Sequence, residues 1–118
     1  MTDPLQKIRE AALELPGTEE RLSHGQPTFF VASKQFAQFR DNHHGDGRTV
    51  VCVRTSSLDE QVMLIEADPE TYSKPAYLPN WISINLAGDA VDWDHVGDRI
   101  AASWELAAPR RLLEAGGR

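Results

Sequence analysis

The sequence has a single cysteine, Cys52, among 118 residues, which excludes an internal disulfide and any zinc site built from several cysteines. It also has no run approaching the ~20 apolar residues that a membrane helix needs. Its first ten residues, MTDPLQKIRE, lack the apolar stretch of a signal peptide. We therefore expect a cytoplasmic protein with no membrane partner.

Basic residues are scarce relative to acidic ones. There are 12 Lys and Arg residues against 18 Asp and Glu, a net charge of −6, and the isoelectric point is near 5.1. This excess of acidic residues argues against binding to a polyanion through a broad positively charged surface. The hydrophobic (41%) and charged (25%) contents are ordinary for a globular protein, and the length fits one domain, which we place at residues 1–118.

The first half of the chain predicts one helix and then three strands. The helix is expected to begin at Asp3-Pro4, where a capping residue precedes proline, and to end before Pro16-Gly17. A polar loop is expected to follow as far as Thr28. Runs rich in Phe and Val then predict strands at residues 28–32, 35–40 and 49–54, with Ser33-Lys34 joining the first two as a hairpin.

The second half predicts two more helices and one strand. Ser57 and Glu60 have capping-box spacing, and Leu58, Val62 and Ile65 form the apolar stripe of the helix that follows. An irregular segment with three prolines occupies residues 69–79, and loops of this length are often functional. Residues 81–86 then alternate between polar and apolar faces, which predicts a half-buried strand.

The last helix is expected to start at a cap on Asp92 and to carry an apolar stripe from Trp93 to Ala107. Pro109 interrupts it, and a short tail restarts as one or two helical turns. The predicted order is α-β-β-β-α-β-α. Three consecutive strands favour an antiparallel sheet with helices packed on one face and the other face open or partly covered, so the predicted fold class is α+β.

Several segments together resemble the MmcQ/YjbR family. They are LPGTEERLSHGQPTFFV with KQFAQF, then HHGDGR, EADPETY, the strand that begins with Trp81, and DWDHVGDRIAASWELAAPRRLL. The resemblance extends from about Leu5 to Leu113. It lies in the ordered combination of these segments, since no single one is catalytic.

The resemblance implies a small frataxin-like (CyaY-like) α+β domain. Members of the family are often labelled DNA-binding because of a double-wing arrangement of hairpins, and the family has no agreed enzymatic activity. A frataxin-like fold also implies iron binding through a carboxylate-rich helix and strand edge. Here Lys7 and Arg9 interleave with the acidic residues of the first helix, which departs from a dense acidic ridge and argues against iron carriage.

The charge is unevenly distributed along the chain. Residues 21–54 carry five basic residues against two acidic ones, whereas residues 59–98 carry nine acidic residues against one lysine. Strand alternation places Trp81, Ser83 and Asn85 on the open face, beside Gln38 and Arg40. Proteins that bind single-stranded nucleic acid combine aromatic rings with arginines on such a surface. The candidate nucleic-acid contacts are Lys34, Arg40, Arg48, Arg54, Trp81, Arg110 and Arg111. The alternative is a solvated sheet face with scattered arginines, which the low isoelectric point favours.

The loop of residues 72–81 gives a different candidate site. Tyr72, Tyr77 and Trp81 could line a groove for a peptide or a small ligand, because aromatic surfaces give binding area at low entropic cost. The alternative is a proline-stiffened loop that packs over the core.

No catalytic constellation is evident in the sequence. His43 and His44, with aspartates on either side, could ligate a transition metal, but a polar hairpin loop explains them and no distant pair of ligands is evident. His24 has no nucleophile at a recognisable spacing, and Cys52 lies within an apolar strand. We predict no catalytic residue, no metal and no cofactor.

These observations rank three hypotheses. The first is a non-enzymatic binding module for DNA that uses the basic hairpins. The second is a protein- or small-ligand-binding adaptor that uses the aromatic loop of residues 72–81. An enzyme comes third, because no nucleophile–base pair, phosphate loop or metal cluster is visible.

Overall fold

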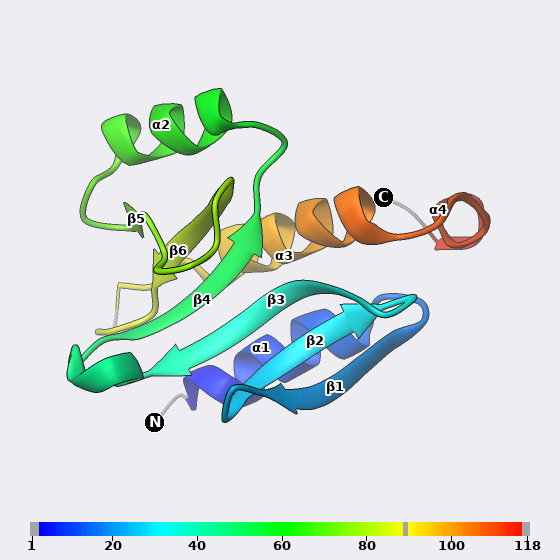
Figure 1. Ribbon diagram of the computed structural model, residues 1–118, viewed down its shortest axis with the longest axis horizontal. Helices are drawn as coiled ribbons and strands as arrows, with labels where there is room; N and C mark the ends of the chain where they lie inside the picture. The colour runs from blue at the N-terminus through cyan, green and yellow to red at the C-terminus, as the bar shows by residue number, and fades with distance from the viewer. Residues whose placement is uncertain (1–2, 89, 117–118) are drawn as a thin grey trace.

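The computed structural model describes residues 3–88 and 90–116, and its centre is a six-stranded sheet (Figure 1). The strands lie in the spatial order β1-β2-β3-β4-β6-β5. Their bounds are β1 Thr18–Ser23, β2 Gln26–Val31, β3 Lys34–Asp41, β4 Thr49–Arg54, β5 Tyr72–Ser73 and β6 Trp81–Asn85. All neighbouring strands pair antiparallel, which confirms the predicted kind of sheet.

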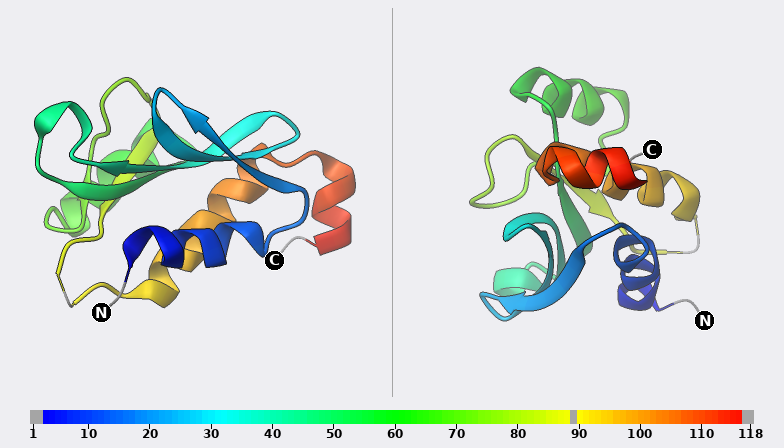
Figure 2. Two further views of the ribbon diagram at one scale, coloured as in Figure 1. Left: turned by 90° about the horizontal axis from the view of Figure 1, so that it is seen from below. Right: turned by 90° about the vertical axis from the view of Figure 1, so that its right-hand side faces the viewer.

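The helices are arranged mainly on one side of this sheet. The helices α1 (Pro4–Leu13) and α3 (Trp93–Ala107) lie together against one face (Figure 2). The helix α2 (Leu58–Ala67) lies beyond the β5 edge, and α4 (Arg110–Gly116) follows α3 at one end of the molecule. A 3-10 turn, η1 (His43–Gly45), connects β3 to β4. The α+β class is therefore confirmed, and no helix in the described ranges is long and apolar enough to cross a bilayer.

The predicted helix starts are confirmed by their capping hydrogen bonds. The Asp3 carboxylate accepts from the Leu5 N–H at 3.1 Å, and the Asp92 carboxylate accepts from the His95 N–H at 3.1 Å. At α2 the Ser57 hydroxyl accepts from the N–H of Glu60, also at 3.1 Å. A cap of this kind contributes about 1 kcal/mol, so local sequence positions all three helices.

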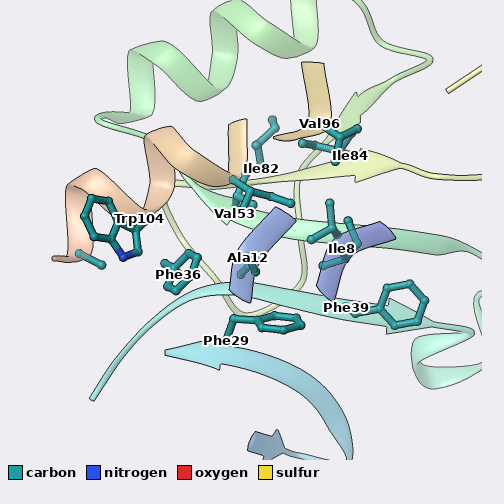
Figure 3. Close-up of a cluster of buried hydrophobic side chains, with 14 of the residues drawn as sticks. Ile8, Ala12, Phe29, Phe36, Phe39, Val53, Ile82, Ile84, Val96 and Trp104 are labelled. Atoms are coloured by element: carbon teal, nitrogen blue, oxygen red, sulfur yellow. The ribbon is translucent and has the colours of Figure 1, made fainter. Parts of the chain in front are cut away.

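The main core lies between the sheet and the pair α1 and α3. Figure 3 shows Ile8 and Ala12 of α1 and Trp104 of α3 facing side chains of the central strands. The sheet contributes mainly Phe29, Phe36, Phe39, Val51, Val53, Ile82 and Ile84. Trp104 is fully buried, and its indole N–H donates to the Pro16 carbonyl at 3.0 Å. Burying each large side chain here contributes about 1.5–3 kcal/mol.

Two strands, β1 and the short β5, were not predicted. The polar loop expected before Thr28 is wrong, because residues 18–23 form β1, the edge strand that pairs with β2. Its sequence, TEERLS, has no apolar alternation, and charged side chains are common on edge strands. Pairing with β2 holds β1 in the sheet. An ion pair between Arg9 of α1 and Glu20 of β1, 2.9 Å apart, links the strand to the helix. A second short strand, β5, lies within the segment expected to be irregular.

The predicted stripe of α2 is also wrong in two of its three positions. Leu58 is 56% exposed and Val62 is 40% exposed, whereas Gln61 is buried and Ile65 packs on the core. The reason is that α2 lies beyond the sheet edge, so that only a narrow side of it contacts the fold. Gln61 anchors that side by donating its Nε2 hydrogen to the carbonyl of Trp81 at 2.5 Å.

Two details of the sheet differ from expectation as well. The β2–β3 turn consists of Ala32 and Ser33, whose φ angles of 49° and 67° suit a two-residue hairpin, and Lys34 begins β3. The strand β6 is buried on both faces and not on one, since Trp81 and Ser83 are also covered. The loop between β5 and β6 lies over this second face, and two of its residues line the candidate site.

Candidate functional site

The face of the sheet opposite α1 and α3 carries buried polar side chains. The strand register places Gln38 of β3 beside Cys52 of β4, and Cys52 beside Ser83 of β6. On the same face, Arg40 lies one alternation further along β3. The predicted grouping of Gln38 and Arg40 with Ser83 on one face is therefore confirmed by the pairing. What alternation alone did not predict is their burial, with Gln38 only 5% and Arg40 only 6% exposed.

A chain of hydrogen bonds connects this polar layer to the loop above it. The Gln38 amide donates to the Thr28 hydroxyl at 3.1 Å, and the Gln38 carbonyl oxygen accepts from Arg40 Nε at 2.8 Å. Arg40 Nη1 then donates to the Ala76 carbonyl at 3.2 Å. Since both hydrogen-bonding ends of Gln38 are engaged, its amide orients the Arg40 guanidinium.

A cavity of about 520 Å³ lies over this layer. It is lined by His24, Gln35, Gln38, Arg40, His43, Tyr77 and Leu78. The β1–β2 turn and the loop between β5 and β6 both rise on the side of the sheet opposite α1 and α3 (Figure 2), and they supply His24 on one hand and Tyr77 with Leu78 on the other. The size and the mixture of polar and apolar walls are those of a small-molecule site.

The rim of the cavity contains residues in a backbone conformation that ordinary side chains avoid. Tyr77 has φ of +66° and is 82% exposed. His24, in the β1–β2 turn, has φ of +53°. A left-handed conformation is uncommon for an aromatic residue, and such positions cluster at ligand clamps and other functional sites. Tyr77 is thus held at the mouth of the cavity at a cost in backbone energy.

A second hollow, of about 380 Å³, lies on the other side of β5 and β6, next to the start of α3. The Tyr72 hydroxyl and His95 Nε2 are hydrogen-bonded there. Its acidic lining residues are Asp68, Glu70 and Asp92. Burial raises the pKa of Tyr72, the charge of Arg99 opposes that shift, and Asp68 adds to it. The hydroxyl therefore stays protonated at neutral pH and is able to donate to the imidazole.

The candidate nucleic-acid residues are in several different environments. Lys34 is exposed at the start of β3, Arg48 is exposed and donates to the Ser73 hydroxyl at 3.1 Å, and Arg110 and Arg111 are exposed on α4. Arg40 and Trp81 are each only 6% exposed. Arg54 is partly buried, which lowers its pKa, and its guanidinium lies 5.3 Å from the centroid of the Trp81 ring.

The three aromatic residues proposed for a groove are also separated. Tyr72 is buried on the α1 and α3 side of the sheet, whereas Trp81 packs with Val50 and Cys52 on the opposite side. Of the three, Tyr77 alone lines the cavity. The loop of residues 72–81 therefore contributes to a pocket through Tyr77 and Leu78.

Metal-binding groups are not assembled in the part of the chain that the structure describes. No three His, Cys, Asp or Glu side chains come together there in a way that would hold an ion. The side chain of His44 and the whole of Asp89 lie outside the described residues. Cys52 is fully buried, and burial raises the pKa of its thiol. The hydrogen bond with Ser83 and the charges of Arg40 and Arg48 lower the pKa, but by less than burial raises it.

Gln35, His43 and Leu78 line one pocket that the sequence pattern did not predict. They are contributed by β3, η1 and a loop that is distant in sequence, so no local spacing unites them. One signal was present: Gln38 and Arg40 place two large polar side chains within a central strand. Such side chains need buried partners or a cavity.

The fold is shared with a solved structure. The chain matches the crystal structure of the Deinococcus radiodurans protein DR2400, which has a DUF419 domain, with a TM-score of 0.73 and 18% sequence identity over 94% of this chain and 86% of that one. A comparison with curated proteins gave no match. The family model described as YjbR matches residues 13–106. The resemblance inferred from the sequence segments is thus confirmed, and the chain belongs to the YjbR family.

Proposed function

We propose that this protein is a binding module that takes a small ligand in the cavity between the β1–β2 turn and the loop of residues 72–81. The observation that carries the proposal is the cavity itself, about 520 Å³ with a polar floor and Tyr77 and Leu78 on its wall. The floor is held rigidly, because Gln38 and Arg40 are buried and hydrogen-bonded to each other. A preorganised floor lowers the entropic cost of binding.

The strained conformation of Tyr77 supports the same proposal. Tyr77 is 82% exposed and has a positive φ, and residues in such conformations cluster at ligand clamps. A ligand beneath the ring would bury it and add the contact area that aromatic side chains supply at low entropic cost.

The test is a fragment titration of the ¹⁵N-labelled chain monitored by NMR, with a panel of neutral and charged aromatic compounds. Binding in the cavity is expected to shift the side-chain amide signals of Gln35 and Gln38 and the backbone amide of Leu78. Tyr77→Ala should weaken that binding several-fold, since it removes one wall. Lys74→Ala is the matched control, because Lys74 is exposed in the same loop and does not line the cavity. A panel that moves none of the lining residues would refute the proposal.

DNA binding is a second candidate, supported by the exposure of four of the basic residues. Lys34, Arg48, Arg110 and Arg111 are all exposed, so they are accessible to a phosphate backbone. The experiment is a fluorescence-polarisation titration of labelled single- and double-stranded DNA at low and physiological salt. Binding through several phosphates should weaken steeply with salt and should be lost in Lys34→Glu and Arg48→Glu. Lys7→Glu, an exposed change on α1, is the control; no binding at low salt rules this candidate out.

A further inference from the structure

The floor of the cavity carries a positive charge that is almost removed from water. Arg40 is 6% exposed, and its hydrogen-bond acceptors, Gln38 Oε1 and the Ala76 carbonyl, are both neutral. The ion pairs found within residues 3–88 and 90–116 involve other arginines, namely Arg9, Arg21, Arg99 and Arg110. A buried ionised group is costly unless a negative charge approaches it.

The other lining residues are compatible with a negative ligand. Although the chain has a net charge of −6, none of the described residues that line the cavity is acidic. His24 and His43 are lining residues as well, and His24 Nδ1 is hydrogen-bonded with the Ser23 hydroxyl at 3.2 Å. Tyr77 and Leu78 supply an apolar wall. The cavity therefore combines one fixed cation, amide and imidazole side chains, and an apolar surface.

From this arrangement we propose that the ligand is a small organic carboxylate, with its carboxylate on the Arg40 guanidinium and its carbon skeleton against Tyr77 and Leu78. The inference rests on the proposed small-ligand function and names its ligand class. A guanidinium presents a planar fork of N–H donors that matches a carboxylate in two parallel hydrogen bonds. Gln38 acts as a positioning residue, since it accepts from Arg40 Nε and so fixes the orientation of the fork.

A carboxylate is favoured over a phosphate by the charge count. A single arginine compensates one negative charge, which is the charge of a monocarboxylate, whereas a phosphomonoester carries about −1.5 to −2 at neutral pH. The apolar wall also suits a ligand with a carbon skeleton next to its charged group. The cavity is thus matched to one charge and one apolar moiety.

The experiment compares aromatic ligands that share a phenyl ring and differ in the charge of the attached group. Benzoate, benzamide and phenyl phosphate are titrated separately into the full ¹⁵N-labelled chain at constant ionic strength, and the shifts of the Gln35 and Gln38 side-chain amides and the Leu78 backbone amide are followed. We expect benzoate to bind at least about tenfold more tightly than benzamide, because the amide has no charge to pair with the buried guanidinium.

Two variants of Arg40 test whether that residue causes the preference for benzoate over benzamide. Arg40→Gln removes the charge and should abolish the preference for benzoate. Arg40→Lys keeps the charge without the fork and should retain part of it. Arg21→Gln is the matched control, because Arg21 is an exposed arginine of β1 that does not line the cavity, and it should leave the preference unchanged. The comparison of benzoate with benzamide in the unaltered chain needs no variant, so it stands even where Arg40→Gln does not fold.

Each outcome separates this inference from the function on which it rests. Equal binding of benzoate and benzamide at the lining residues would overturn the carboxylate assignment and leave the small-ligand function standing. Tighter binding of phenyl phosphate than of benzoate would overturn it too. If no probe, charged or neutral, moves a lining residue, both the assignment and the proposed function fail.

Discussion

Cys52 illustrates how the environment of one residue decides its chemistry. Its side chain is fully buried on the cavity side of the sheet, 3.4 Å from the Ser83 hydroxyl. Burial raises the pKa of the thiol, and the hydrogen bond with Ser83 and the charges of Arg40 and Arg48 offset only part of that shift. Since the thiolate is the reactive form, the native protein should resist thiol reagents.

We expect Ellman's reagent to label Cys52 at least about a hundredfold more slowly in the native protein than in guanidinium-unfolded protein, because reaction must wait for the sheet to open. The measurement is the absorbance change at neutral pH in each condition, with glutathione in the same buffers as the reference thiol. Fast labelling while the far-ultraviolet circular dichroism stays native would contradict the buried position.

Gly17 is a second position at which one residue constrains the fold. Its φ is +69°, and a Cβ placed on it would lie 2.9 Å from Leu112 Cδ1 of α4. Gly17→Ala should therefore destabilise the protein by about 1–2 kcal/mol through backbone strain and displacement of Leu112. Gly25→Ala is the matched control, since Gly25 has φ of +77° with nothing within 4 Å of the added Cβ.

Urea unfolding of both variants separates the two causes. Backbone strain is common to them, so the extra loss in Gly17→Ala measures the contact with Leu112. Because Leu112 packs on the core, Gly17→Ala is also made in a Leu112→Ala background, where it should cost only the strain relative to Leu112→Ala alone. Equal stabilities of the Gly17 and Gly25 variants would mean that α4 adjusts without cost.

At the residue scale, the sequence predicted which side chains share a face but not how deeply they lie. Alternation in β3 and β6 correctly grouped Gln38 and Arg40 with Trp81. Their burial comes from the loop of residues 72–81, which crosses that face and accepts a hydrogen bond from Arg40 at Ala76. This burial depends on the path of a segment that is distant in sequence, and the alternation of residues within a strand carries no information about that path.

At the scale of elements, the attachment of α2 to α3 includes an ion pair. The Glu60 carboxylate accepts from the Ser56 N–H at 2.8 Å and pairs with Arg99 of α3 at 3.5 Å. Leu58, Val62 and Met63 are exposed, so apolar packing of α2 is limited. The link through Glu60 is therefore a large part of what connects α2 to α3.

Burial on its own would raise the pKa of Glu60, but the hydrogen bond from Ser56 and the charge and hydrogen bond of Arg99 outweigh it, so the folded-state pKa is lowered. The unfolded value is about 4.3. The ionised group therefore stabilises the fold above that pH, and this contribution is lost as the pH falls through the lower folded-state pKa.

Glu60→Gln should lower the free energy of unfolding at pH ~7 by up to about 1 kcal/mol, and the difference from the unaltered protein should shrink at pH ~3. Urea unfolding at the two pH values measures it. Glu66→Gln, an exposed change on the same helix, is the control and should show no such pH-dependent difference. A Glu60 effect that is the same at both pH values would contradict the lowered pKa.

The elements that sequence reasoning found are those with strong local signals. The caps at Asp3, Ser57 and Asp92 set three helix starts, and the Phe- and Val-rich runs set β2, β3 and β4. The strand β1 was missed because TEERLS is stabilised by pairing with β2 and by the Arg9–Glu20 ion pair, both of which are tertiary. The exposed stripe of α2 has the same explanation: periodicity marks an apolar face, and the packing of the sheet edge decides whether it is buried.

At the scale of the whole molecule, the sheet separates two groups of buried side chains. The larger lies between the sheet and the helices α1 and α3, with Trp104 in it. The smaller lies on the cavity side and consists of Val50, Cys52 and Trp81, with Leu78 packed against it. Both groups are attached to the same strands, β4 and β6, so neither loses its packing without disturbing the backbone that supports the other.

We therefore predict one cooperative unfolding transition for residues 1–118, with an enthalpy of about 80 kcal/mol near 60 °C from the usual value per residue. Two double variants allow each group to be observed separately: Trp93→Phe with Trp104→Phe leaves Trp81, and Trp81→Phe with Trp93→Phe leaves Trp104. In each variant the midpoint from tryptophan fluorescence should coincide with the midpoint from far-ultraviolet circular dichroism. A Trp81 signal that changes well below the circular dichroism midpoint would show that the cavity side opens by itself. The cavity would then be a locally mobile site and the preorganised floor around Arg40 would be lost, because that floor depends on the same loop and strands that hold Trp81 in place.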